Sequence, residues 1–187
     1  MYILASGSPR RRELLSYIIP EYKCEISGCE EFVPEGTPIE RVPALLAEQK
    51  AIAVAEKHPN DTVIGSDTIV VLDGKIYGKP KDKADAHRML KTLSGRTHTV
   101  LTGVAVAENG SVRSFVKSTE VEFYELSDEF IDRYIETGDP LDKAGAYGIQ
   151  GKGAVFIEGI DGDFFNVMGL PLCRLCKMLS ERGVELL

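Results

Sequence analysis

The chain has 187 residues, of which 43% are hydrophobic and 27% charged, and its formal net charge is -7. These proportions are ordinary for a soluble globular protein, and the acidic balance argues against general nucleic-acid coating, which needs a basic surface. No apolar run reaches the roughly 18 residues of a membrane-spanning helix, and no secretory leader pattern precedes the first strand-like segment. We therefore expect a cytoplasmic protein that binds neither membrane nor nucleic acid.

The N-terminal segment predicts a strand, a tight turn and a helix. "YILA" (2–5) is typical of a short buried strand, and Ser8 and Pro9 suit the N-cap and first turn of a helix over about 9–18. Residues 10–12 are three consecutive arginines at the helix start, where the helix dipole favours negative charge. The N-terminus of a helix is also a good site for an anion such as phosphate. We expect a bound anion to compensate the three cations, the alternative being a solvated helix face.

The next segments predict a helix followed by β structure. Thr37 and Glu40 form a capping-box pattern for a helix over 37–58, which a proline at position 43 would bend or divide. Two β-rich segments then flank Gly-Ser-Asp-Thr (65–68), and Asp-Gly (73–74) predicts a hairpin turn.

The remaining segments continue the interleaving of helices and strands. They are expected to be a helix over 82–93, a hairpin of 97–107 and 113–124 joined at 109–110, a helix over 127–138, strands at 154–160 and 164–168, and a helix over 171–182. This order predicts an α/β fold with a mixed twisted sheet and flanking helices, because hairpins force some antiparallel pairs. No linker or repeat is visible, so we expect a single domain over 1–187, arranged as two lobes around an elongated cleft.

The four cysteines admit two interpretations. Cys24 and Cys29 with Cys173 and Cys176 have spacings that could hold zinc. Cys173 and Cys176 also lie three residues apart among leucines, where they would share the buried face of a helix as small hydrophobic residues. We favour core packing over zinc.

Several charged and polar residues form a candidate site. Asp67 follows a glycine at the expected end of a strand, where α/β sheets often place ligand-binding residues, although a simple Asx-turn is the alternative. Lys79 lies in a rigid Gly-Lys-Pro frame, and Gln150 lies in a glycine-rich loop where an amide can recognise a ring. Together with the arginines at 10–12 these cations suit a polyanion, while Glu31 and Asp67 suit Mg²⁺ or Mn²⁺.

The motifs that carry these residues resemble the Maf proteins. In chain order they are "ASGSPRRRELL", "EE…P", "EQKA", "IGSDTIVVLDG", "GKPKD", "MLKTLSGRTHTVLTG", "DKAGAYGIQG" and "NVMGLPL". The match extends over nearly the whole chain. The resemblance implies a fold similar to that of inosine triphosphate pyrophosphatases, with a long cleft between lobes, and a homodimer.

The resemblance also implies roles for individual residues. Asp67 matches the catalytic aspartate and a metal ligand, and Glu31 matches the second acid, although the pair Glu30-Glu31 leaves open which of the two reaches the metal. The positions that match the phosphate-handling set are Ser8, Arg11, Lys50 and Lys79. The two lysines count as catalytic because they would neutralise the departing pyrophosphate. The positions that match those tied to choice of base are Arg10, Thr68 and Gln150.

The implied activity is hydrolysis of nucleoside triphosphates to monophosphate and pyrophosphate with a divalent cation. The loop with Gln150 is similar to that of the branch acting on dTTP and UTP. Two alternatives stay open at this point. One is a nucleotide-binding regulator of septum formation without turnover, and the other is a hydrolase of non-standard purine or 7-methylguanosine triphosphates.

Overall fold

Strands and helices alternate along the chain in the computed structural model, which describes residues 1–181. The strands are β1 (Tyr2–Leu4), β2 (Tyr22–Cys24), β3 (Thr62–Leu72), β4 (Lys75–Tyr77), β5 (Thr97–Glu108), β6 (Ser111–Phe123) and β7 (Ile157–Asp161). The α-helices are α1 (Pro9–Ser16), α2 (Val42–Ala55), α3 (Lys83–Leu93), α4 (Asp128–Ile135), α5 (Phe164–Met168) and α6 (Leu172–Ser180). The short 3₁₀ helices are η1 (Ile39–Arg41), η2 (Asp139–Asp142), η3 (Ala144–Ala146) and η4 (Gly151–Phe156).

The sheet is mixed, which confirms the predicted fold class. Across the described residues its seven strands have the order β2-β1-β3-β5-β6-β7, with β4 paired to β3. β1 is parallel to β2 and β3, whereas β4 is antiparallel to β3 and β7 is antiparallel to β6. No helix within residues 1–181 is long and apolar enough to cross a membrane.

The chain divides into two compact units, and β3, β5 and β6 contribute residues to both. Unit 1 comprises Met1–Thr68, Thr102–Lys117 and the described residues from Gly169 on. Unit 2 comprises Ile69–Leu101 and Ser118–Met168. That the whole chain behaves as one domain stays a prediction.

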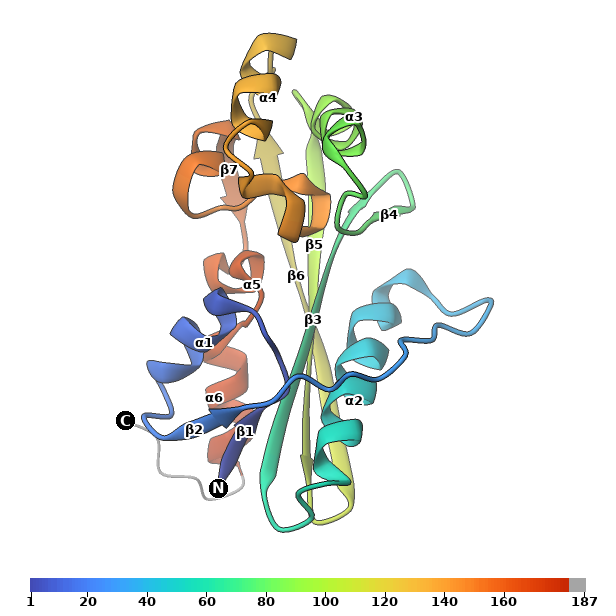
Figure 1. Ribbon diagram of the computed structural model, residues 1–187, viewed down its shortest axis with the longest axis vertical. Helices are drawn as coiled ribbons and strands as arrows, with labels where there is room; N and C mark the ends of the chain where they lie inside the picture. The colour runs from blue at the N-terminus through green and yellow to red at the C-terminus, as the bar shows by residue number, and fades with distance from the viewer. Residues whose placement is uncertain (182–187) are drawn as a thin grey trace. The chain divides into compact units, whose positions relative to one another are not determined.

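Unit 1 is built on close packing between α2 and the sheet. Alanines of α2, including Ala47 and Ala51, are buried with residues of β1, β3 and β5. A Cβ on Gly103 would lie only 2.2 Å from the carbonyl group of Pro43, so the helix backbone rests directly on the strand. In Figure 1, α2 lies on one side of these strands, and α1 and α6 lie on the other.

Unit 2 is built around an aromatic cluster. Phe123 contacts the rings of Tyr147 and Phe156 edge to face, with centroids 4.7 and 5.9 Å apart, and Tyr134 contacts Phe156 at 4.7 Å. Such edge-to-face pairs are favourable beyond the area they bury. Figure 1 shows α3 and α4 at the same end of the strands of this unit. The cluster connects the sheet to the segment that follows α4.

Two predicted boundaries around α2 and β3 are wrong. The Thr37 hydroxyl donates to the Pro34 carbonyl oxygen at 2.7 Å instead of capping a helix, and α2 begins only at Val42. Pro43 lies in its first turn, where proline costs no hydrogen bond, so it does not bend the helix. β3 continues without a break through Gly-Ser-Asp-Thr, so Asp67 lies within a strand and makes no Asx-turn.

The C-terminal predictions are also corrected. Phe164–Met168 is a short helix instead of a strand, because the Asp163 carboxylate accepts hydrogen bonds from the backbone N–H groups of Phe165 and Asn166. α6 is confirmed, but Arg182, its predicted end, lies outside the described residues. The short strand β2 was not predicted.

The expected core packing of the C-terminal cysteine pair is wrong. Cys173 is exposed and Cys176 is only partly buried, because the buried face of α6 carries Leu172, Leu175 and Leu179 instead. A helix of this length has a single apolar stripe, and the leucines already fill it.

Candidate functional site

The Lys50 ammonium lies between two carboxylates in unit 1. Its Nζ is 2.5 Å from Oδ1 of Asp67 and 3.0 Å from Oε1 of Glu31. The side chains of Lys50 and Asp67 are each 15% exposed, whereas that of Glu31 is 47% exposed. A helix, a strand and a loop thus bring three predicted site residues together. Glu31 is the acid of the Glu30-Glu31 pair that contacts Lys50.

Gly65 explains how Lys50 reaches Asp67. A Cβ on Gly65 would lie 2.3 Å from the carbonyl oxygen of Ala47 and 3.0 Å from the backbone nitrogen of Ala51. Only glycine permits the helix backbone to approach the strand this closely. Because side chains alternate along a strand, Gly65 and Asp67 point to the same face of β3. Asp67 therefore points toward α2 and meets Lys50.

The hydroxyl residues that alternate with Gly65 and Asp67 along β3, Ser66 and Thr68, point to the opposite face. The Ser66 hydroxyl donates to the carbonyl oxygen of Gly169 at 2.9 Å, and the Thr68 hydroxyl lies 2.9 Å from the hydroxyl of Thr102. The tetrapeptide Gly-Ser-Asp-Thr consequently presents its carboxylate to one side of the sheet and its hydroxyl groups to the other.

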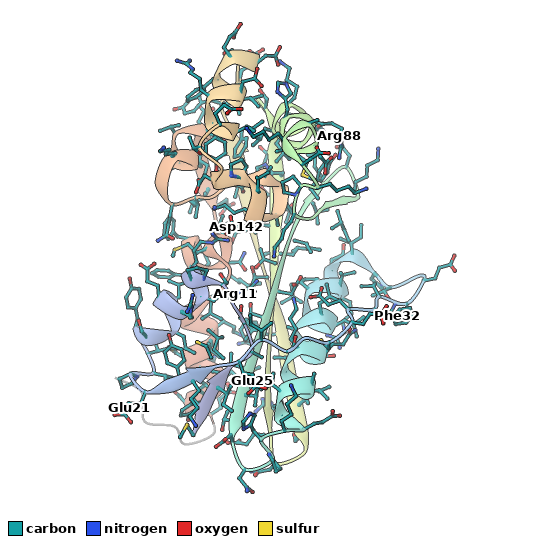
Figure 2. All side chains as sticks on the ribbon, in the orientation of Figure 1. Arg11, Glu21, Glu25, Phe32, Arg88 and Asp142 are labelled. Atoms are coloured by element: carbon teal, nitrogen blue, oxygen red, sulfur yellow. The ribbon has the colours of Figure 1, made fainter. Side chains whose placement is uncertain are left out.

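The Arg11 guanidinium contacts the Thr68 hydroxyl and the Gly169 carbonyl oxygen on this face. Arg11 donates from Nε to the Gly169 carbonyl oxygen at 2.9 Å, from Nη2 to Thr68 Oγ1 at 3.0 Å, and from Nη1 to Ser6 Oγ at 3.4 Å. Figure 2 shows Arg11 on the side of the strands that faces α6. Burial lowers the pKa of the guanidinium, and the nearby Asp67 carboxylate opposes that shift. A guanidinium has five N–H donors, so these three bonds leave it capacity for a further acceptor.

The start of α1 has the predicted cap. The Ser8 hydroxyl accepts from the Arg11 backbone N–H at 3.5 Å, and no acidic residue lies in the first turn. Arg10 is partly exposed and Arg12 is exposed. The positive end of the helix dipole and these side chains coincide, as the sequence predicted, but the compensating anion stays a prediction.

In unit 2, the segments that carry Lys79 and Gln150 are joined. The Gly145 N–H donates to the Gly78 carbonyl oxygen at 3.0 Å. Gly145 has a φ of 69°, and a Cβ there would lie 2.9 Å from Cγ2 of Val70. The glycine is therefore required both by its conformation and by its close approach to β3. Lys79 is exposed and Gln150 is partly exposed, so both side chains are available to a ligand.

Lys143 holds the segment before Gln150 in place. Its Nζ donates to the Asp139 carbonyl oxygen at 2.5 Å, to Asp139 Oδ1 at 3.1 Å and to Asp142 Oδ1 at 2.7 Å. A Cβ on Gly148 would lie 2.9 Å from Cε of Lys143, so the lysine stem lies against the loop backbone. The side chain is only 11% exposed. We infer that it stabilises the loop.

The predicted site residues are distributed over both units. Those in unit 1 are Ser8, Arg10, Arg11, Glu31, Lys50, Asp67 and Thr68, and those in unit 2 are Lys79 and Gln150. The first unit brings together Asp67, Glu31 and Lys50, and separately Arg11 and Thr68.

The two carboxylates fit Mg²⁺ or Mn²⁺ only in combination with a substrate. Within residues 1–181 no group of three or more His, Cys, Asp or Glu side chains could hold a metal ion. Mg²⁺ commonly uses one or two carboxylates together with substrate phosphates and water. Asp67 and Glu31 converge on one cation, the Lys50 ammonium, which is the arrangement such shared coordination needs.

Sequence reasoning missed two residues that position the candidate site. Gln49, beside Lys50, forms two hydrogen bonds with the backbone of Phe32, the residue after Glu31. Lys143 stabilises the loop before Gln150. Gln49 could have been suspected from its place in "EQKA", but its partner lies in an irregular loop that no pattern predicts.

Comparisons with known proteins agree on one family. The family described as Maf-like protein matches residues 1–182. The chain is 51% identical over 183 residues to a protein of Bacillus pumilus (strain SAFR-032) named dTTP/UTP pyrophosphatase, covering 97% of this chain and 96% of the relative. A Bacillus cytotoxicus protein with the same name is 50% identical over 180 residues, covering 96% of this chain and 94% of the relative.

Solved structures support the fold. The Staphylococcus aureus Ham1 protein aligns with a TM-score of 0.57 and 15% identity, covering 98% of this chain and 99% of that one. A HAM1 protein from Coxiella burnetii aligns with a TM-score of 0.54 and 16% identity, covering 96% and 98%. The family match over nearly the whole chain and the identity near one half lead to a single conclusion: the chain belongs to the Maf-like protein family.

Proposed function

We propose that the protein hydrolyses dTTP and UTP to the nucleoside monophosphate and pyrophosphate. The observation that carries the proposal is the cluster of Asp67, Glu31 and Lys50, in a chain whose relatives are named dTTP/UTP pyrophosphatase. A water molecule attacks the α-phosphorus, the anhydride bond to the β-phosphate breaks, and pyrophosphate leaves.

The chain's own residues supply proton transfer and charge stabilisation. Asp67 accepts a proton from the attacking water, a role worth about 10²- to 10⁴-fold in rate. Lys50 and Lys79 bind phosphate oxygens and stabilise the negative charge that collects on pyrophosphate. Ser8 and Arg11 bind phosphate oxygens at the positive end of α1. Mg²⁺ or Mn²⁺, held by Asp67 and Glu31, would supply further neutralisation of the phosphates when bound.

Choice of base is assigned to Arg10, Thr68 and Gln150. An amide both donates and accepts, so Gln150 can match the carbonyl and N–H groups on the edge of a pyrimidine. Its support is its partly exposed place in a loop stabilised by Lys143. The Gln150→Glu variant removes the donors, so we expect its preference for dTTP and UTP over purine triphosphates to fall, and an unchanged profile would remove Gln150 from this role.

The remaining expectations concern assembly and location. A homodimer is what the resemblance to the family implies, and a cytoplasmic location stays a prediction from the sequence. Sedimentation equilibrium at micromolar concentration tests the dimer, and a monomer under these conditions would reject it.

A substrate panel tests the activity. Purified protein is incubated with dTTP, UTP, standard purine triphosphates, inosine triphosphate and 7-methyl-GTP, each with Mg²⁺ or Mn²⁺, and the products are identified by anion-exchange chromatography. Pyrophosphate from dTTP and UTP supports the proposal, whereas orthophosphate would mean that a different bond is cut. Nucleotide binding without turnover would instead favour a regulatory protein.

The Asp67→Asn variant is the matched control for chemistry. It keeps the size of the side chain and removes its basicity, so we expect kcat to fall at least about 10²-fold while nucleotide affinity changes little. Turnover near that of the wild type would exclude Asp67 as the base.

A further inference from the structure

The acid Glu31 lies in a segment without regular structure. Residues 25–38, between β2 and η1, form neither helix nor strand. The neighbouring Phe32 side chain is 68% exposed, and Figure 2 shows it on the loop beside α2. Burial of its own side chains therefore does not fix this part of the loop. Glu31 nevertheless reaches to within 3.0 Å of Lys50.

Gln49 binds the loop through both polar groups of one peptide residue. The Phe32 N–H donates to Gln49 Oε1 at 3.0 Å, and Gln49 Nε2 donates to the Phe32 carbonyl oxygen at 2.6 Å. A side-chain amide offers a donor and an acceptor side by side, as a neighbouring strand does. The two bonds fix the position and the orientation of the backbone at Phe32.

We call the two hydrogen bonds between Gln49 and Phe32 the clamp. The residues of the clamp are adjacent in sequence to the residues of the site, both on α2 and in the loop. Gln49 and Lys50 are consecutive on α2, and Glu31 and Phe32 are consecutive in the loop. Gln49 holds Phe32 while Lys50 contacts Glu31. We propose that Gln49 is a positioning residue that acts through Glu31, holding its carboxylate beside Lys50 and Asp67. This inference rests on the proposed function, because it assigns Glu31 to the reacting site.

The chemistry of the clamp distinguishes Gln from Glu at position 49. A glutamate could still accept from the Phe32 N–H, but it would place a carboxylate oxygen against the Phe32 carbonyl oxygen. Two acceptors cannot share a hydrogen bond, so half of the clamp would be lost. The Gln49→Met variant keeps the length of the stem and removes both bonds.

Limited proteolysis tests the clamp without reference to activity. Chymotrypsin cleaves after exposed aromatic residues. Cleavage after Phe32 is followed by mass spectrometry, with cleavage after Tyr17, the residue that follows α1, as an internal reference. When opening is fast, cleavage reports the population of the open loop. We expect Gln49→Met to raise cleavage after Phe32 about tenfold and Gln49→Glu to raise it less. Asn60→Ala, at an exposed turn, is the control and should match the wild type.

A double-mutant cycle tests the route through Glu31. We expect Gln49→Met to lower kcat for dTTP at least about tenfold in the wild-type background and less than about twofold in the Glu31→Gln background. The unfolding midpoint of Gln49→Met should stay within about 3 °C of the wild type, because the loop lies outside the core. A merely structural residue would lower kcat equally in both backgrounds.

The outcomes separate the two proposals. Unchanged cleavage after Phe32 in Gln49→Met, or equal loss of kcat in both backgrounds, would overturn the positioning role. If the wild type releases no pyrophosphate from any triphosphate, the proposed function fails, and the clamp is then judged by the cleavage rates alone.

Discussion

His98 makes the stability of unit 2 dependent on pH. The side chain is 2% exposed, packs edge to face against the rings of Phe123 and Tyr147 with centroids 4.9 and 5.3 Å apart, and its Nε2 is 2.8 Å from the Tyr147 hydroxyl. Among the described residues, its Nδ1 has no hydrogen-bonding partner. Burial lowers the pKa of His98 from 6.5 to about 4, because the charged imidazolium would have to give up its hydration.

The lowered pKa of His98 determines the sign and the size of the change in unfolding free energy with pH. The unfolded chain binds a proton at His98 below pH 6.5, whereas the folded chain does so only near pH 4. The contribution to stability is therefore fully present above pH 6.5 and lost as the pH falls toward 4. At 1.36 kcal/mol per pKa unit, the loss is about 2 kcal/mol at pH 5 and about 3 kcal/mol below pH 4.

Urea unfolding at pH 8, 6.5 and 5 measures how the free energy of unfolding changes with pH in the wild type and in His98→Leu. The variant leaves the Tyr147 hydroxyl without its partner, so we expect lower stability at pH 8. The loss between pH 8 and 5 should nevertheless be about 2 kcal/mol smaller than in the wild type. Carboxylates whose pKa is lowered in the fold, such as Glu25 and Asp85, are present in both proteins, so their contributions cancel. Equal losses in the two proteins would refute the reasoning.

Three further predictions follow from contacts in the site. Lys143→Met should raise KM for dTTP about tenfold with little change in kcat, because the loop before Gln150 loses the hydrogen bonds from Lys143 to Asp139 and Asp142. An unchanged KM in steady-state kinetics would contradict that role. Arg11→Lys should lower the free energy of unfolding by about 2 kcal/mol, since the single nitrogen of an ammonium cannot reach the three acceptors that the three guanidinium nitrogens contact, and an unchanged urea midpoint would mean that these bonds contribute nothing. Gly65→Ala should cost about 3 kcal/mol or more because its Cβ would lie 2.3 Å from the Ala47 oxygen, and a wild-type urea midpoint would show that α2 can move away.

Local patterns predicted the parts of the fold that depend on local physics. The Asn109-Gly110 turn has φ values of 50° and 72°, the left-handed conformation that this dipeptide favours. The helices expected from positions 82 and 127 begin with the N-caps Asp82 and Ser127, whose side chains each accept from a backbone N–H three residues on. These features depend on a few consecutive residues, so the sequence contains the information needed to predict them.

Predictions failed where tertiary contacts override local preference. Gly-Ser-Asp-Thr has the composition of a turn, yet it continues β3 because α2 lies against Gly65 and polar partners lie on both faces. The aromatic and β-branched character of Phe164–Met168 favours a strand, but the Asp163 carboxylate starts a helix there.

The candidate site was predictable in its charges and not in its geometry. Asp67 and Glu31 could be suspected as acids suited to a divalent cation, and the resemblance singled out Lys50 as well. The contact between Glu31 and Lys50 depends on an irregular loop that Gln49 holds in place. No periodic sequence pattern predicts the contact between Gln49 and this loop. Only the folded chain reveals that pairing.

The alternation along β3 makes the order of letters in Gly-Ser-Asp-Thr as important as their identity. Exchanging Ser66 and Asp67 would keep every residue type, yet it would direct the acid toward the Arg11 guanidinium and leave the Lys50 ammonium opposite a hydroxyl. Gaining or losing one residue in this stretch would have the same inverting result, whereas surface loops absorb such changes in length. Positions 65 and 67 therefore serve one face of the sheet, and positions 66 and 68 serve the other. A search for related chains should require this alternation rather than overall sequence similarity alone.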